Sequence, residues 1–170
     1  MSIVTFTPLN ISVLTVSDTR DEKTDSSGGF LTGAIRRAGH MLFKKDIVKD
    51  DIYAIRAIVS DWIANSTINV VITTGGTGFY ARDITPEAIS PLFDKPIEGF
   101  GELFRDISYK DIGTSTIQSR SFGGMANNTA IFCLPGSENA CRTGWDEIIA
   151  KQLDSRTKPC HFVDHLLGPE

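Results

Sequence analysis

The chain has 170 residues, of which 41% are hydrophobic and 22% are charged. These proportions are ordinary for a globular protein and exclude both a disordered chain and a membrane-embedded one. The formal net charge is -4 and no long run of basic residues occurs, which argues against nucleic acid as a partner. A chain of this length fits one compact domain, so we predict a single domain over residues 1–170.

The N-terminal stretch MSIVTFTPLN has neither the basic region nor the apolar core of an export signal. No apolar run approaches the roughly 20 residues that a bilayer requires. We therefore expect a cytoplasmic protein with no membrane contact.

The three cysteines, Cys133, Cys141 and Cys160, are odd in number and show no Cys-x-x-Cys spacing. This pattern predicts reduced thiols rather than a disulfide framework or a zinc knuckle. His161 and His165 could bind zinc with Cys160 only if the tail were helical and a further ligand arrived, so we expect no zinc site there.

The first predicted unit is a strand, a loop and a helix. The branched run at 11–16 is typical of a buried strand, which ends before Ser17. A polar loop follows, after which Ser26 or Ser27 is expected to cap a helix that Gly39 closes.

The same order then repeats. A second strand is predicted at 41–48, followed by a helix that Asp50 or Asp51 caps and whose apolar residues recur every three or four positions. The third strand is predicted at 70–72. The sequence Thr-Pro-Glu at 85–87 has the form of a helix start, with a capping threonine and a proline at the first helical position.

The second half of the chain continues the alternation. Apolar residues at helical spacing predict a helix within 96–110, and the run at 129–134 predicts another buried strand. A last helix is expected over 141–153, with an irregular tail from 155 onward. Alternating strands and helices predict an α/β fold of three layers, in which helices cover both faces of a mostly parallel sheet.

Ligands of such sheets bind outside the carboxyl ends of the strands, near a topological switch point. Three loops are expected at this edge: Ser17 with Asp18, the sequence TTGGTG at 73–78, and Pro135-Gly136-Ser137.

The glycine-rich loop is the strongest local signal. Gly75, Gly76 and Gly78 allow positive φ angles and close approach of a ligand, so that successive N–H groups can point at phosphate oxygens. Thr74 and Thr77 add hydroxyl donors for such a ligand. A tight turn that binds nothing is an equally open interpretation, and the loop is neither a Rossmann fingerprint nor a Walker A loop.

Asp83 follows this loop and Asp50 follows the second strand, so both carboxylates could reach the same edge of the sheet. Two carboxylates beside a phosphate site suggest Mg²⁺, which takes oxygen ligands from carboxylates and from substrate phosphates. The alternative for Asp50 is a helix cap.

Ser119 and Arg120 place a hydroxyl and a guanidinium side by side, which suits an anionic group. A surface ion pair is an equally open interpretation for Arg120.

Six motifs taken together, in this order, resemble the MoaB/MogA family of molybdopterin-binding proteins, and the resemblance covers most of the chain. The tail at 154–166 looks closer to the MoaB branch. The motifs are VSDT at 16–19, IVKDD at 47–51, TTGGTGFYARDITPEA at 73–88, GFGELFR at 99–105, TIQSR at 116–120 and LPGS at 134–137.

The resemblance implies a MogA/MoaB-like fold and a role in molybdenum cofactor biosynthesis. Catalytic members adenylylate molybdopterin with Mg-ATP to give AMP-molybdopterin and pyrophosphate. The implied ligands are therefore molybdopterin, ATP and Mg²⁺. The resemblance also implies a homo-oligomer, trimer or hexamer, and partners among the other proteins of the pathway.

Carried over by position, Asp50 and Asp83 would be the catalytic and metal-binding aspartates. The loop at 75–78 would hold phosphate, and Ser108 and Ser119 would match serines near the pterin and the nucleotide. The predicted substrate-binding set is completed by the residues of the three edge loops, which are Ser17, Thr74, Pro135, Gly136 and Ser137.

Two residue patterns depart from those of adenylylating members. Lys49 replaces a proline before Asp50, and the loop at 135–137 lacks a second proline. Asp51 is a second candidate for the role of Asp50. Three hypotheses stay open: a molybdopterin adenylyltransferase, a non-catalytic molybdopterin-binding or carrier protein, and an enzyme acting on another nucleotide phosphate.

Overall fold

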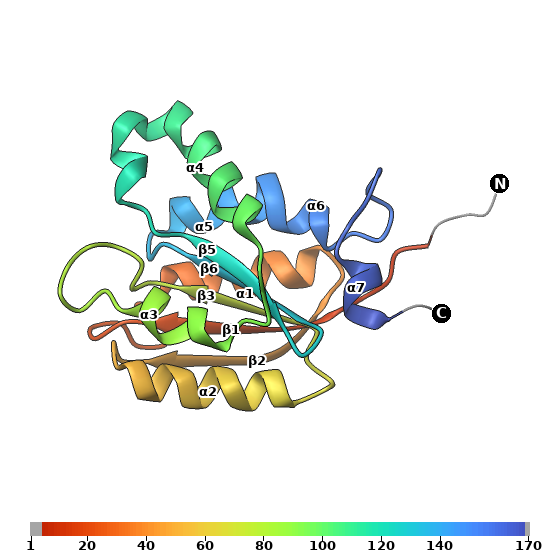
Figure 1. The fold of residues 1–170 in the computed structure, drawn as a ribbon, viewed down its shortest axis with the longest axis horizontal. Helices are drawn as coiled ribbons and strands as arrows, with labels where there is room; N and C mark the ends of the chain where they lie inside the picture. The colour runs from red at the N-terminus through yellow and green to blue at the C-terminus, as the bar shows by residue number, and fades with distance from the viewer. Residues whose placement is uncertain (1–4, 169–170) are drawn as a thin grey trace.

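The computed structural model describes residues 5–168 and contains one sheet with the strand order β2-β1-β3-β6-β5-β4 (Figure 1). Neighbouring strands from β2 to β6 are parallel, whereas β5 and β4 extend the sheet with antiparallel pairs. The predicted mostly parallel α/β sheet is confirmed. The strands are β1 (Asn10–Val16), β2 (Met41–Val48), β3 (Val70–Thr74), β4 (Lys95–Pro96), β5 (Phe122–Ala126) and β6 (Thr129–Leu134).

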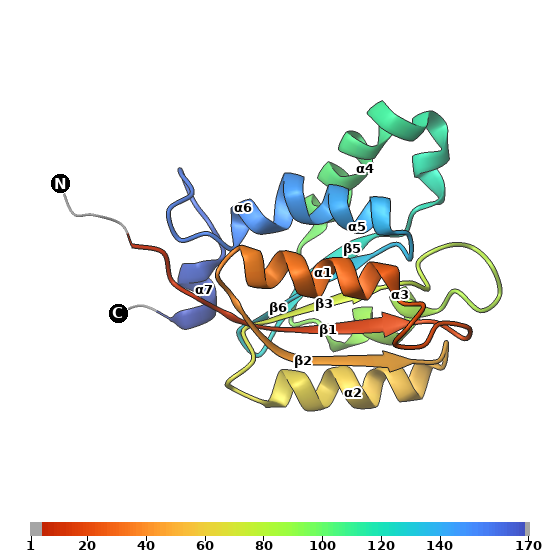
Figure 2. The same ribbon diagram turned by 180° about the vertical axis from the view of Figure 1, so that it is seen from behind.

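Helices cover both faces of the sheet, which gives the expected three layers. Figure 2 shows α1, α5 and α6 on one face and α2 on the other. The helices are α1 (Ser26–Arg37), α2 (Ile52–Ala64), α3 (Thr85–Ile89), α4 (Glu98–Ile112), α5 (Glu138–Gly144), α6 (Ala150–Gln152) and α7 (Val163–Leu167). Shorter turns are η1 (Ser90–Leu92), η2 (Gly113–Gln118) and the π-helical η3 (Trp145–Ile149).

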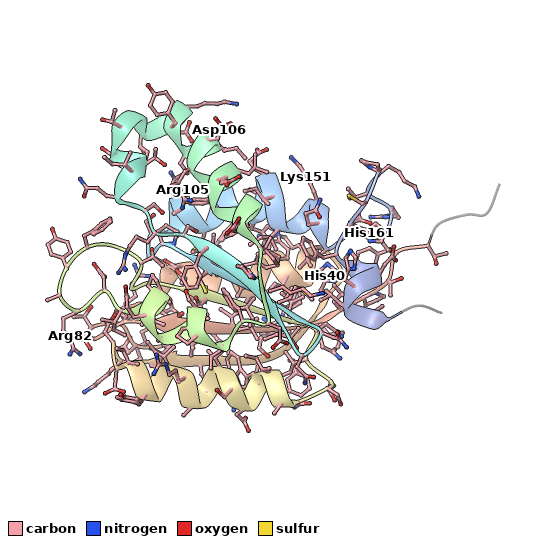
Figure 3. The ribbon with its side chains drawn as sticks, in the orientation of Figure 1. His40, Arg82, Arg105, Asp106, Lys151 and His161 are labelled. Carbon is pink, nitrogen blue, oxygen red and sulfur yellow. The ribbon has the colours of Figure 1, made fainter. Side chains whose placement is uncertain are left out.

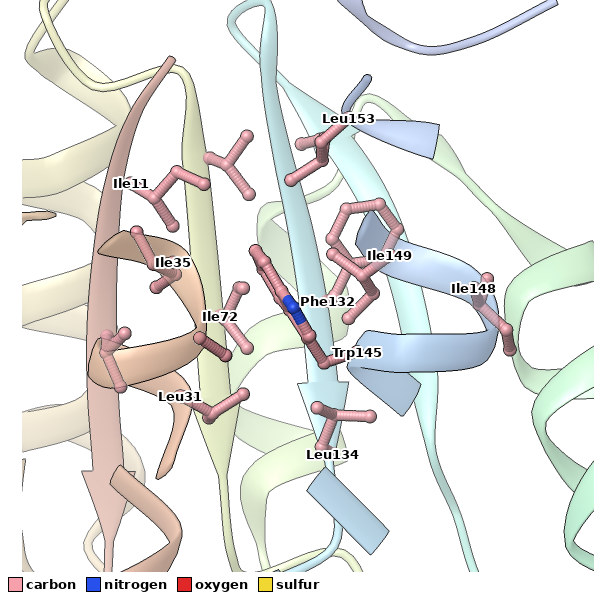
Figure 4. Packing of buried hydrophobic residues seen from close by; sticks show 14 of the residues in the cluster. Ile11, Leu31, Ile35, Ile72, Phe132, Leu134, Trp145, Ile148, Ile149 and Leu153 are labelled. Atoms are coloured by element: carbon pink, nitrogen blue, oxygen red, sulfur yellow. The ribbon is translucent and has the colours of Figure 1, made fainter. Parts of the chain in front are cut away.

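The core lies on both sides of the sheet because successive strand residues point to opposite faces. Ile11 and its equivalents on β3 and β6 pack against α1, α4 and α5, whereas the intervening residues pack against α2 and α3. Figure 4 shows Ile72 and Phe132 between the sheet and the helical segments that carry Leu31 and Trp145. The continuous apolar runs of the strands follow from this two-sided burial.

The topology places a switch point between β1 and β3. From β1 the chain passes through α1 to β2 at the edge of the sheet, and α2 then returns it to β3 on the other side of β1. The loops that follow Val16 and Thr74 therefore leave in different directions. A crevice between such loops is where open α/β sheets bind ligands.

Two of the expected helix caps differ from the structure. Asp25, not Ser26 or Ser27, caps α1, because its carboxylate accepts the Gly28 amide at 2.9 Å. Thr85 lies inside α3, and its hydroxyl donates to a loop carbonyl instead of capping the helix. The hydroxyls of Ser27 and Thr85, which the local sequence predicted as caps, instead donate to the carbonyls of Gly136 and Gly75.

Three regular elements were not predicted: β4, β5 and α7. β5 forms a hairpin with the predicted strand β6, and the turn residues Asn127 and Asn128 both have positive φ angles, as a type I′ turn requires. The pair of asparagines was the available sequence signal. β4 and α7 were also missed, so the expectation of an irregular tail was wrong for 163–167.

Within residues 5–168, no helix has both the length and the apolar character to cross a membrane. Cys133 and Cys141 are buried thiols and Cys160 is exposed. In Figure 3, His40 and His161 both lie toward the end of the molecule opposite Arg82.

Candidate functional site

Two cavities open at the carboxyl edge of the sheet. The first has a volume of about 480 Å³ and the second about 470 Å³. Gly76, Asp83, Gly136 and Ser137 line both, so the cavities meet at these residues. Every residue of the predicted catalytic and substrate-binding set lines one cavity or the other, whereas Arg120 and Asp51 line neither.

The first cavity lies between the glycine loop (75–78), α4, η2 and the start of α5. Ser108 and Phe104 face it from α4, and Ser119 faces it from the segment after η2. The Ser119 Oγ is buried and has no hydrogen-bond partner among the described residues. A buried hydroxyl without a partner is costly, so the cavity wall holds a polar group that a ligand could satisfy.

The second cavity lies at the switch point. Ser17, Asp18, Asp50 and Thr74 line it together with Gly75. Its wall is thus built from the loops after β1, β2 and β3. These are the loops that the strand order brings together.

Only glycine fits the first two positions of the glycine loop. Gly75 has a φ of +107°, and an added Cβ would lie 2.1 Å from the Val16 carbonyl oxygen. Gly76 has a φ of +67°, and its Cβ would lie 2.3 Å from Thr85 Oγ1. Thr85 fixes both residues, because its hydroxyl donates to the Gly75 carbonyl at 2.8 Å and its amide donates to the Gly76 carbonyl at 3.0 Å.

Backbone amides of this loop are available to a ligand. The Gly75 amide donates to the Leu134 carbonyl at 3.0 Å. The amides of Gly76, Thr77 and Gly78 find no acceptor within residues 5–168. Successive free amides of this kind form a typical anion-binding site.

Asp50 and Asp51 have separate roles. Asp51 caps α2 by accepting the Ala54 amide at 2.7 Å, so capping was the wrong interpretation for Asp50. Asp50 instead faces the second cavity. Burial raises its pKa above the ordinary value, and the charges of Asp18 and Asp83 raise it further.

Asp18 links the loops after β1 and β3. Both of its carboxylate oxygens accept from Arg82, each at 2.8 Å. The hydrogen bonds from Arg82 hold the pKa of Asp18 below its usual value. Asp18 also accepts the Asp50 amide at 3.2 Å, which ties the loop after β2 to the same pair.

Asp83 lies where the two cavities meet, and one of its carboxylate oxygens accepts the Tyr80 amide at 2.9 Å. Arg120 supports the same loop by donating to the carbonyls of Gly78 and Asp83, at 2.9 and 2.7 Å. It also forms an ion pair with Glu87. The ion-pair interpretation of Arg120 therefore holds, and its guanidinium positions the loop.

The Thr74 hydroxyl is used inside the fold. It donates to the Pro135 carbonyl at 2.9 Å and accepts from the Cys141 thiol at 3.2 Å. Its expected role as a donor to a ligand is therefore wrong for this hydroxyl hydrogen. The contact instead fastens the 135–137 loop to the end of β3.

Ser27 fastens the same loop from the other side by donating to the Gly136 carbonyl at 2.6 Å. Ser137 caps α5 and still lines both cavities.

Several cavity residues had no role in the sequence interpretation. Phe79 and Tyr80 stand at the first cavity with 69% and 86% of their surface exposed. Large exposed aromatic side chains after a glycine loop were an available signal. Asp18 was expected at this edge only as a member of the loop with Ser17, and its ion pair with Arg82 was not predicted.

Known proteins share this fold and sequence. Residues 12–155 match the family described as "Probable molybdopterin binding domain". Molybdenum cofactor biosynthesis protein B of Escherichia coli (strain K12) is 55% identical over 161 residues, which cover 95% of each chain.

Two solved structures are similar in shape. A crystal structure of molybdenum cofactor biosynthesis protein B aligns with a TM-score of 0.84 and 42% identity, over 86% of this chain and 92% of the other. The tungsten cofactor synthesizing protein MoaB from Pyrococcus furiosus aligns with a TM-score of 0.75 and 37% identity, over 85% and 92%. The resemblance indicated by the sequence motifs is thereby confirmed.

Proposed function

Because the chain belongs to the family of molybdopterin-binding domains that includes molybdenum cofactor biosynthesis protein B, we propose that it acts in molybdenum cofactor biosynthesis. It binds molybdopterin at the carboxyl edge of the sheet and adenylylates it with Mg-ATP. The observation that carries this proposal is the meeting of two cavities at Asp83 and Gly76. Two substrates in separate cavities would have their reacting phosphates at that junction.

Molybdopterin occupies the first cavity. Its pterin contacts the apolar Phe104 surface, and the Ser119 hydroxyl, which has no partner among the described residues, supplies a polar contact. Its terminal phosphate lies at the free amides of the glycine loop, since these amides suit an anion.

The nucleotide phosphates occupy the second cavity together with Mg²⁺. The raised pKa of Asp50 supports this assignment, because neighbouring carboxylates crowd there and a cation would relieve their repulsion. No cage of three or more His, Cys, Asp or Glu side chains exists within residues 5–168. Mg²⁺ needs only one or two carboxylates, because phosphates and water complete its shell.

In the reaction, an oxygen of the molybdopterin phosphate attacks the α-phosphorus of ATP. A new P–O bond forms, the bond from the α-phosphorus to the bridging oxygen breaks, and pyrophosphate leaves. Mg²⁺ supplies charge neutralisation for the phosphates when bound. The protein contributes positioning: the glycine-loop amides hold phosphate oxygens, while Asp50 and Asp83 orient the charged groups at the junction. No covalent enzyme intermediate is needed.

The test is anaerobic incubation of the protein with molybdopterin, ATP and Mg²⁺, followed by detection of AMP-molybdopterin. We expect product from the wild type. Asp83→Asn should lower the rate at least about 100-fold, a typical loss for one electrostatic group of an active site. Its fold should persist, because the asparagine carbonyl oxygen can still accept the Tyr80 amide.

Asp51→Asn is the matched control. Asp51 follows Asp50 in the chain, but it caps α2 and lines neither cavity. The variant should keep wild-type activity. Equal activity of Asp83→Asn and the wild type would contradict the catalytic assignment. Tight molybdopterin binding without product would indicate a carrier protein and not an enzyme.

A further inference from the structure

Arg105 lies on α4, in the GFGELFR motif that the proposed reaction leaves unexplained (Figure 3). Its guanidinium is partly buried and Nη1 donates to the Ser121 carbonyl at 2.9 Å. The same nitrogen approaches the Ser119 carbonyl at 3.5 Å. Arg105 is thus directed at the segment 119–121, which joins η2 to β5.

This segment is held from two other sides. The Arg120 amide donates to the carbonyl of Thr77, within the glycine loop, at 3.0 Å. The Ser121 hydroxyl donates to the Cys133 carbonyl on β6 at 2.6 Å. Arg105 supplies the contact from α4, so the segment that contains Ser119 is attached on three sides.

Helix α4 approaches the segment closely at Gly101. A Cβ on this residue would lie 2.5 Å from the Ser121 carbonyl oxygen and 2.9 Å from Arg105 Nη2. A Cβ on Gly99, in the same helix, would meet nothing within 4 Å. The two glycines of the motif therefore differ, and only Gly101 makes room for the guanidinium and the carbonyl that it binds.

We propose that Arg105, seated against Gly101, is a positioning residue that holds Ser119 toward the ligand of the first cavity. The assignment of that ligand as molybdopterin rests on the proposed function. Arg105 acts through the backbone of Ser119 and Ser121 and does not itself line this cavity. Its effect should therefore reach the first cavity and spare the second.

Arg105→Met removes the donors, and Gly101→Ala displaces the same carbonyl without changing charge. Both should weaken molybdopterin binding about tenfold, the loss of about 1.4 kcal/mol expected for a misplaced polar contact. Binding of Mg-ATP should stay within about twofold of wild type. In the protein alone, amide hydrogen exchange at 119–121 should become faster.

Gly99→Ala and Lys110→Met are the matched controls on α4. The first adds the same methyl group where space is open, and the second removes a positive charge elsewhere on the helix. Both should keep wild-type binding and exchange. Unchanged exchange at 119–121 in Arg105→Met and Gly101→Ala, or equal weakening of both ligands, would overturn the proposal.

A separate result tests the proposed function. If the wild type does not bind molybdopterin, the assignment of molybdopterin to the first cavity is wrong. Faster exchange at 119–121 in Arg105→Met and Gly101→Ala would then still support the positioning of Ser119.

Discussion

Asp50 and Asp51 are neighbours in the chain, yet their side chains have different surroundings. Asp51 satisfies an amide of α2, which is a common and stabilising use of a carboxylate. Asp50 is partly buried near Asp18 and Asp83, and its pKa is raised. An ionised carboxylate in such surroundings lowers folding stability, a cost typical of ligand sites.

We expect Asp50→Asn to raise the thermal midpoint at pH 7 by about 1–2 °C while weakening the binding of Mg-ATP. The folded-state pKa of Asp50 lies above its ordinary value of 3.8, so ionisation opposes folding at higher pH. The increase in thermal midpoint is fully present above the folded-state pKa of Asp50. It should vanish as the pH falls below 3.8, where the wild-type carboxyl is protonated in both the folded and unfolded states.

Thermal unfolding at about pH 7 and about pH 3.5 measures this difference. Isothermal titration calorimetry with Mg-ATP measures the predicted weakening of nucleotide binding. A lower midpoint for Asp50→Asn at pH 7 would show that Asp50 stabilises the fold and would argue against a ligand role.

At the scale of elements, Asp25 joins α1 to the first two strands. Its carboxylate caps α1, accepts the Thr15 hydroxyl at 2.8 Å and pairs with Lys45 at 3.0 Å. Burial opposes ionisation, but the hydrogen bonds from the Gly28 amide, Thr15 and Lys45 bring the pKa of Asp25 below its usual value.

Asp25→Ala should cost about 2–4 kcal/mol of unfolding free energy at pH 7, because it removes a cap and leaves Lys45 without its partner. The depressed pKa makes this stabilisation complete above 3.8 and lost as the pH falls through the folded-state pKa. Urea unfolding at several pH values checks both statements.

Asp51→Ala provides the comparison, since Asp51 caps α2 with its side chain exposed. Its cost should be about 1 kcal/mol. Equal costs for the two variants would mean that the contacts of Asp25 with the strands add nothing to the cap.

At the scale of the whole molecule, many large apolar side chains are exposed. Met41 and Phe43 on β2, with 61% and 43% of their surface exposed, lie on an edge strand, and Tyr109, Ile112 and Ile117 lie on and after α4. Exposed apolar groups of this size are typical of surfaces that other chains cover.

We therefore expect a homo-oligomer, as the family resemblance implies. Light scattering at micromolar concentration should give three or six times the chain mass of 18.6 kDa. A mass of 18.6 kDa would show a monomer and remove this prediction.

The regular elements were predictable where the local pattern was strong. The strands at 41–48 and 129–134 have the predicted bounds. All of β6 is buried between the helix layers, which selects branched and apolar residues directly, whereas β2 is a half-exposed edge strand. β5 was missed because Phe122-Gly123-Gly124-Met125-Ala126 lacks such a run. Its pairing with β6 depends on a hairpin turn and on a partner strand.

The sequence by itself determined which residues stand at the ligand edge, since parallel strands joined by helices all end on one side of the sheet. It did not determine where the side chains point. Only the tertiary structure decided that Asp50 faces a cavity while Asp51 caps a helix, and that the Thr74 hydroxyl binds Pro135. Such contacts join atoms far apart in the chain, and local periodicity carries no information about them.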